Sequence, residues 1–125
     1  MNVIDSSCWI EYLMASEIGM SVAAVIENPN ELIVPTITLY EVYKKLSVEK
    51  SEEYAQKVIA YMQTGTVIEL NSELSIKAAN VSRKNKLAMA DSIIYATSLY
   101  YSALLYSCDE HFKDLTDVHY YPKTN

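Results

Sequence analysis

The chain has 125 residues, half of them apolar, and a formal net charge of −6 at pH 7. This length and composition predict one packed domain over residues 1–125, exclude a disordered chain, and argue against broad electrostatic attraction to nucleic acid. No apolar run reaches the roughly 18 residues of a membrane span and the N-terminus lacks a signal-peptide pattern, so we expect a cytoplasmic protein with no membrane partner.

The first half of the chain predicts two strands and three helices. Apolar runs bounded by polar or turn-forming residues predict the strands, and apolar residues at helical spacing predict the helices. In chain order these are a strand at 2–5, helices at 8–15 and 18–26, a strand at 31–35, and a helix whose apolar side runs from Leu39 to Leu46. We expect Ser6 or Ser7 to cap the first helix, and Thr36 or Thr38 to cap the third.

The second half of the chain continues the alternation of helices and strands. In chain order it predicts a helix at 51–64, a strand at 66–70, helices at 71–85 and 87–102, a strand at 103–108, a short helical turn at 110–115 and a strand at 118–121. Gly65 is expected to stop the helix that precedes it. This alternation predicts an α/β layered fold with a mostly parallel sheet, in which ligands gather beyond the carboxyl ends of the strands.

Four of the sixteen acidic residues occupy positions that converge on that end of the predicted sheet. They are Asp5 and Asp109, which end the first and fourth strands, Glu41, near the start of the helix after the second strand, and Asp91, in the first turn of the helix at 87–102. A structural alternative stays open for three of them. Asp5 and Asp109 can cap the elements that follow, and Asp91 can interact favourably with the helix dipole. Glu41 is harder to explain in this way, because it lies inside an apolar stretch of its helix.

The chemistry of four neighbouring carboxylates points to a bound cation. Such groups repel one another, and a divalent cation cancels their charge. Oxygen ligands without a histidine or cysteine pattern favour Mg²⁺, with Mn²⁺ as the alternative, over zinc. Discounting these four negative charges changes the net charge from −6 to −2. A cation held in this way neutralises a phosphate ester and activates water, and a carboxylate can orient or deprotonate that water.

Four segments of the chain, VIDSS, YEVYKKL, LAMADSIIYATS and YSCDEHFKDL, resemble the PIN-domain ribonucleases, and most of all the VapC toxins of prokaryotic toxin–antitoxin pairs. The resemblance implies a PIN-like (Rossmann-like) three-layer α/β/α sandwich and a Mg²⁺-dependent endoribonuclease. By motif, it assigns catalytic and metal-binding roles to Asp5, Glu41, Asp91 and Asp109. Asp5 and Asp91 would be the most direct metal ligands, and Ser107 a supporting group. The resemblance also implies an RNA substrate, a homodimer, and a cognate antitoxin that blocks the acidic groove.

The chain departs from this family pattern in two respects. Many relatives carry a further acid two positions after the last one, where this chain has His111, and this weakens the prediction of a second metal site. The chain has few arginines, so RNA contacts would rest on stacking and on lysines such as Lys44, Lys45, Lys84 and Lys86. Tyrosines at apolar helix positions, including Tyr40 and Tyr95, are interpreted as core or dimer contacts rather than as stacking platforms.

Two other functions share parts of this pattern. A metal-dependent phosphatase also uses an aspartate at a strand end, but it needs a DxD pair, and Asp5 is followed by Ser6 and Ser7. A non-catalytic regulatory domain phosphorylated on an aspartate would need a lysine near the sheet edge, which the sequence does not identify. Cys8 and Cys108 form no CxxC pair and are interpreted as reduced, structural cysteines.

Overall fold

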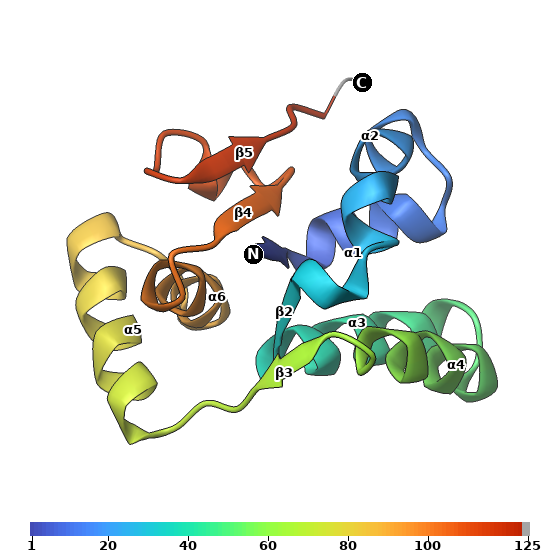
Figure 1. The fold of residues 1–125 in the computed structure, drawn as a ribbon, viewed down its shortest axis with the longest axis horizontal. Coiled ribbons are helices and arrows are strands. Elements are labelled where there is room, and N and C mark those ends of the chain that lie inside the picture. The colour runs from blue at the N-terminus through green and yellow to red at the C-terminus, as the bar shows by residue number, and fades with distance from the viewer. Residues whose placement is uncertain (124–125) are drawn as a thin grey trace.

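A five-stranded sheet forms the centre of residues 1–123, the part of the chain that this computed structural model describes (Figure 1). Its strands are β1 (Asn2–Ile4), β2 (Leu32–Pro35), β3 (Thr66–Ile68), β4 (Leu104–Ser107) and β5 (Val118–Tyr120). They lie in the order β3-β2-β1-β4-β5, and every neighbouring pair is parallel. The predicted α/β fold with a mostly parallel sheet is therefore confirmed.

Helices cover both faces of the sheet. They are α1 (Ser6–Leu13), α2 (Glu17–Ile26), α3 (Thr36–Glu49), α4 (Glu52–Met62), α5 (Ser72–Asn85) and α6 (Met89–Tyr100), with 3₁₀ turns at Pro29–Glu31 and Glu110–Phe112. Figure 1 shows α1 to α4 on one side of the sheet and α5 and α6 on the other. This arrangement is the three-layer α/β/α sandwich that the family resemblance implies.

The two apolar layers follow from the alternation of side chains along each strand. Ile4 packs into the cluster that contains Trp9 of α1, whereas its neighbour Val3 packs into the cluster that contains Ile94 of α6. Successive residues of a strand point to opposite faces, so a strand covered on both faces needs an unbroken apolar run. This is the physical reason for the short continuous runs of apolar residues in the sequence.

The strand order creates a crevice at the carboxyl ends of β1 and β4. The chain moves outward from β1 to β2 and β3, then returns through α5 and α6 to place β4 on the other side of β1. The connections after β1 and β4 consequently leave in different directions, which is where open parallel sheets bind ligands. Asp5 follows β1 directly, and Asp109 lies two residues beyond β4.

The predicted caps of α1 and α3 are wrong. Asp5 occupies the cap position of α1 and Pro35 that of α3, and neither side chain makes a capping hydrogen bond. The hydroxyls of Ser6 and Ser7 are instead engaged by carboxylates at the sheet edge. Long-range hydrogen bonds have here displaced a local capping preference.

Gly65 has a packing role rather than the predicted role of a helix stop. Helix α4 ends at Met62, with Gln63 at its cap position, so the helix ends before the glycine. A Cβ atom at residue 65 would lie 3.1 Å from Cβ of Leu32, tighter than ordinary contact. A glycine here lets the backbone approach β2 closely.

None of the helices in residues 1–123 is by itself both long and apolar enough to cross a membrane. The pair α1 and α2, bent by 107°, passes only on combined length and composition.

Candidate metal centre and acidic cavity

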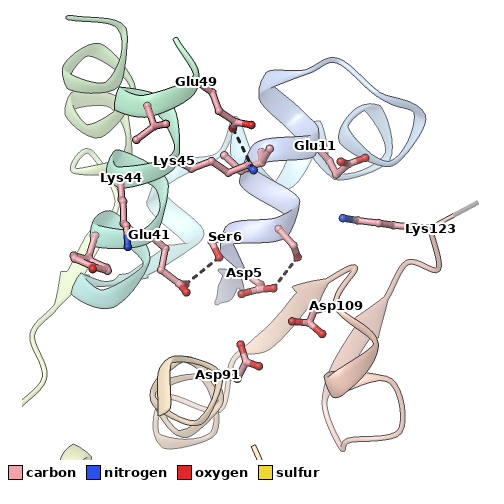
Figure 2. A pocket seen from close by; sticks show the side chains of 14 residues that line it. Asp5, Ser6, Glu11, Glu41, Lys44, Lys45, Glu49, Asp91, Asp109 and Lys123 are labelled. Carbon is pink, nitrogen blue, oxygen red and sulfur yellow. Dashed lines mark hydrogen bonds and ion pairs between the residues drawn. The ribbon is translucent and has the colours of Figure 1, made fainter. Parts of the chain in front are cut away.

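The four acidic residues singled out in the sequence line one cavity of about 690 Å³ (Figure 2). They come from four elements: Asp5 from the end of β1, Glu41 from α3, Asp91 from the first turn of α6, and Asp109 from the segment after β4. Figure 2 shows their carboxylates turned toward a common space. The four positions are therefore brought together at the carboxyl end of the sheet.

Asp5 lies at the bottom of the cavity and is fixed by two serine hydroxyls. Ser7 Oγ donates a hydrogen bond of 2.7 Å, and Ser107 Oγ one of 2.8 Å, to the same oxygen, Oδ2. The backbone N–H of Asp5 also donates to the carbonyl of Tyr106, which continues the β1–β4 ladder. We call Asp5, Ser7 and Ser107 the Asp5 group. The two hydroxyls hold the carboxylate in one orientation.

Ser107 connects two of the acidic residues. Besides donating to Asp5, its fully buried hydroxyl accepts a hydrogen bond of 3.0 Å from the backbone N–H of Asp109. The supporting position predicted for Ser107 thus corresponds to a contact with both acidic segments. Its removal would leave a buried N–H and a buried carboxylate without this partner.

Glu41 reaches the cavity from α3 and is held by α1. Ser6 Oγ donates a hydrogen bond of 3.0 Å to its Oε1. The side chain is half-buried in the cavity wall rather than packed in the apolar core. The serines that follow Asp5 in the sequence therefore orient two different carboxylates.

Asp91, Asp109 and His111 form a second polar group, which we call the His111 group. Nδ1 of His111 lies 3.0 Å from Oδ1 of Asp109 and 3.7 Å from Oδ2 of Asp91. Asp109 also accepts the backbone N–H of His111 at 2.9 Å and so caps the 3₁₀ turn, as the structural alternative predicted. Asp91 lies in the first turn of α6, which agrees with the dipole alternative. Both residues have these local roles and also face the cavity.

Two carboxylates in the cavity, those of Asp5 and Glu41, retain protons more readily than ordinary acids do. Burial raises the pKa of Asp5, and the charge of Asp109 raises it further, while the hydroxyls of Ser7 and Ser107 lower it. Burial also raises the pKa of Glu41, against the lowering effect of its bond to Ser6. Crowded negative charges in a partly dry space produce this pattern.

Asp91 shows the mutual repulsion most directly. Burial, followed by the charges of Asp109, Asp5 and Glu41, raises its pKa to about 6, and His111 acts in the opposite direction. Each of the other three carboxylates is therefore close enough to disfavour the ionised form of Asp91. A cation in this space would relieve the repulsion and favour ionisation of all four.

The donor set of the cavity fits a divalent cation. Within residues 1–123, none of the four carboxylates forms an ion pair with a lysine or arginine. The ligand atoms of Asp91, Asp109 and His111 all lie within 4.8 Å of one another, a spacing that can hold one ion. Carboxylate oxygens are the ligands that Mg²⁺ and Mn²⁺ prefer in proteins.

Lysines line the outer part of the same cavity. Lys44 and Lys45 extend from α3, and Lys123 faces them from the segment after β5 (Figure 2). Lys45 is paired with Glu49 at 3.1 Å. The predicted lysines Lys84 and Lys86, at the C-terminal end of α5, do not line this cavity.

Two tyrosines that helical spacing predicts to be packed differ in the structure, and only one of them is buried. Tyr95 is buried between α6 and the sheet, as predicted. Tyr40 is instead 59% exposed, lines the cavity, and has Nζ of Lys44 5.8 Å from its ring centroid. Its exposed ring beside a lysine is available to stack on a base, the role that the sequence analysis had set aside.

Sequence reasoning missed several residues that complete the cavity. Ser6 and Ser7 were interpreted as helix caps, while Glu11 and Lys123 were not singled out. A pair of serines directly after a strand-end aspartate was the signal available for the first two. Glu11 carries no such signal, since its place in the cavity wall depends on the packing of α1 against α3.

Cys8 and Cys108 meet in the core beside the site. Both are buried free cysteines in the cluster formed by α1 to α4, and they lie close enough for each thiol to shift the pKa of the other. Neither belongs to the polar lining of the cavity. The interpretation of both as structural residues agrees with this placement.

Comparison with known proteins gives one family and a consistent set of folds. The family model described as PIN domain matches residues 3–118. No curated protein sequence matches the chain significantly.

Solved structures similar to this chain include three from toxin–antitoxin systems. A toxin–antitoxin complex from Klebsiella pneumoniae superposes with a TM-score of 0.77 and 19% identity, over 95% of this chain and 96% of that one. VapC20 of Mycobacterium tuberculosis, described as a toxin that cleaves the sarcin–ricin loop, superposes with a TM-score of 0.76 and 16% identity, over 94% of this chain and 97% of that one. VapBC-1 of nontypeable Haemophilus influenzae superposes with a TM-score of 0.68 and 22% identity, over 96% of each chain. At these identities the likeness concerns the fold.

Proposed function

This chain belongs to the PIN-domain family, and from that membership and its acidic cavity we propose that it is a Mg²⁺-dependent endoribonuclease. It would hydrolyse phosphodiester bonds of RNA as the toxin of a toxin–antitoxin pair, with Mn²⁺ as an alternative cofactor. One observation carries the proposal: four carboxylates from four elements face one cavity, and none has a lysine or arginine as an ion-pair partner within residues 1–123. A cation and a phosphate group complete that arrangement electrostatically.

In the proposed mechanism, Asp5 and Asp91 are the principal cation ligands, and Glu41 and Asp109 complete the pocket. The bound cation supplies charge neutralisation of the scissile phosphate and a lower pKa for an attacking water. The Asp5 group needs no rearrangement, because two hydroxyls already hold Oδ2 of Asp5. Such pre-organisation is a large part of the rate enhancement in phosphoryl transfer.

Glu41 is positioned to receive a proton. Its Oε1 is held by Ser6, so we assign Oε2 as the atom that accepts the proton of the attacking water. A carboxylate oriented in this way can take the proton as a general base. The water oxygen then bonds to phosphorus while the bond from phosphorus to the ribose oxygen breaks, and that oxygen leaves from the opposite side and takes a proton from solvent.

The outer cavity supports a polynucleotide as substrate rather than a small phosphate ester. Lys44 and Lys45 on one wall and Lys123 on the other could each contact a phosphate on either side of the cleaved bond, and Tyr40 offers a stacking surface. The similar VapC20 of Mycobacterium tuberculosis is described as a toxin that cleaves the sarcin–ricin loop. Both points favour RNA as the substrate class.

The proposed partners follow from the similar structures. Several of them are complexes of a toxin with its antitoxin, so we propose a cognate antitoxin that occupies the acidic cavity, and a homodimer of this chain. The proposal places the enzyme in the cytoplasm, where its RNA substrates are found. Sedimentation of the purified chain tests the dimer directly, and a monomer at micromolar concentration would contradict it.

The central test is cleavage of a mixed RNA pool by the purified chain in Mg²⁺, in Mn²⁺, and in chelator. We expect cleavage with either ion, none in chelator, and a loss of about 100-fold or more in Asp91→Asn. Asp114→Asn is the matched control, because it makes the same chemical change at an exposed acid outside the cavity. Cleavage that persists in chelator, or that is equal in the two variants, would contradict the proposal. Hydrolysis of a small phosphate ester without RNA cleavage would favour the phosphatase alternative.

A further inference from the structure

The His111 group contains a nitrogen ligand beside two carboxylates. Nδ1 of His111 lies 3.0 Å from Asp109 and 3.7 Å from Asp91, and the three ligand atoms span at most 4.8 Å. The imidazole is 68% exposed, whereas the side chains of Asp91 and Asp109 are 16% and 32% exposed. The group is thus open on the side of the ring and enclosed on the side of the carboxylates.

These spacings match the first coordination sphere of a six-coordinate ion. With metal–ligand bonds of about 2.1 Å, neighbouring ligands lie about 3.0 Å apart and opposite ligands about 4.2 Å apart. The distances from Nδ1 to the two aspartates lie in this interval. The donor atoms need only small side-chain adjustments to surround a cation.

We propose that Nδ1 of His111 is a ligand of the cation that Asp91 and Asp109 hold, and that it shifts the preference of this site from Mg²⁺ toward first-row transition ions. The inference rests on the proposed function, because it concerns the same cavity. Mg²⁺ binds oxygen ligands and keeps its water, whereas transition ions gain from an imidazole nitrogen. An all-oxygen set would lack this discrimination.

The alternative role for His111 is that of a counter-charge that does not contact the cation. This role predicts the opposite change in cation binding when the ring is removed. If the ring serves only to balance the charge of Asp109, its removal would leave the cavity more negative and would strengthen binding of every divalent cation. If the ring is a ligand, its removal weakens binding of transition ions and leaves Mg²⁺ little changed. The sign of the change therefore decides between a ligand and a counter-charge.

The chain offers a matched control in its only other histidine. His119 stacks between Tyr106 and Tyr121, with ring centroids 5.4 and 4.4 Å away, and does not line the acidic cavity. His119→Ala removes the same side chain from strand β5. It should leave the metal preference unchanged.

The experiment titrates the metal-stripped full chain with Mg²⁺ and with Mn²⁺ by calorimetry, and examines the Mn²⁺ complex for nitrogen-14 modulation by pulsed electron paramagnetic resonance. We expect wild type and His119→Ala to show nitrogen modulation and to bind Mn²⁺ more tightly than Mg²⁺. His111→Ala should lose the modulation and about tenfold or more of its Mn²⁺ affinity. His111→Asp should restore binding but favour Mg²⁺, because its third ligand is oxygen.

Bound Mn²⁺ without nitrogen modulation would overturn the role of His111, as would tighter Mn²⁺ binding in His111→Ala. In either case, RNA cleavage that still depends on Mg²⁺ and Asp91 would leave the proposed function standing. Failure of the wild type to bind either ion would overturn this inference and the metal-dependent function together.

Discussion

The Asp5 group and the His111 group lie at the same edge of the sheet but are built differently. Asp5 is 3% exposed and Ser107 is fully buried, and two hydroxyls converge on one carboxylate oxygen. The His111 group is more open, with an imidazole that is 68% exposed and supplied by a 3₁₀ turn. The Asp5 group is therefore a buried, fixed set of contacts, whereas the His111 group is open to solvent.

The difference teaches how a small fold can hold a buried carboxylate in place while leaving neighbouring carboxylates accessible. Burying Asp5 disfavours its ionised form, which is visible as its raised pKa, and only part of this is offset by the two serines. The strands on either side of Asp5 make that unfavourable placement persist. The outer residues remain close to water and can adapt to the proposed cation and RNA substrate.

Among the substitutions that test this comparison, Asp5→Asn should have the largest effect. We expect RNA cleavage to fall by about 100-fold or more, because a buried, fixed cation ligand loses its charge. In chelator, the same variant should melt at a higher temperature than wild type, because the amide oxygen keeps both serine contacts without an ionised group in a dry site. Calorimetric melting and a cleavage assay check the two effects, and a Tm lower than that of wild type would contradict the second.

Ser107→Ala should produce the next largest effect. Loss of its hydroxyl removes contacts to Asp5 and to the N–H of Asp109, so we expect about 1.5–3 kcal/mol of destabilisation and about 10-fold weaker metal binding. The control is Ser98→Ala, since Ser98 is also fully buried but bonds only a helix carbonyl. Urea unfolding and metal titration give both quantities. Equal behaviour of the two variants would show that Ser107 is ordinary packing.

The raised pKa of Asp91 predicts that the stability of the metal-free chain depends on pH. Its pKa is raised from 3.8 to about 6 in the folded chain, so the folded state binds a proton that the unfolded state has released. The resulting stabilisation is present below about pH 4 and is lost as pH rises through about 6. After allowance for solvent screening, we expect this loss to lower the free energy of unfolding by about 1 kcal/mol and Tm by about 4 °C.

The measurement compares wild type with Asp91→Asn in chelator between pH 4.5 and 7.5. Wild type should lose more stability over this interval, and saturating Mg²⁺ should remove the difference in slope, because the bound cation favours the ionised carboxylate. Asp114→Asn serves as the control for the general effect of removing one acid. A steeper decline in Asp91→Asn than in wild type would contradict the assignment.

The smallest expected effect lies in the outer cavity, at Lys44. Replacing it by glutamine should weaken RNA binding by about fivefold at most and lower the slope of log affinity against log salt by about 0.7, as for one lost phosphate contact. Lys57→Gln is the control, because Lys57 is exposed on α4 and pairs with Glu53. Binding to a catalytically inactive Asp5→Asn background measures this without cleavage. An unchanged salt slope would exclude a phosphate contact.

Much of the fold was predictable because its signals are local. Apolar runs such as 31–35 and 103–108 identify buried strands, and their alternation with helices predicts parallel pairing. Strand-end positions then place Asp5 and Asp109 at one edge without knowledge of the strand order. The helix starts were misjudged where serines after Asp5 had stronger partners than the helix backbone, and so were the helix-stop role of Gly65 and the burial of Tyr40.

The sequence by itself determined the layered α/β architecture and the four carboxylates at the end of its sheet, because periodicity and strand ends are properties of neighbouring residues. The tertiary structure alone decided what surrounds each carboxylate. The parallel register that pairs Ile4 with Tyr106 brings Ser107 beside Asp5 across 102 positions of the chain, and the packing of α1 against α3 brings Ser6 to Glu41. Such contacts depend on the geometry of the whole fold, since hydrogen bonds act over about 3 Å and carry no mark in the local sequence.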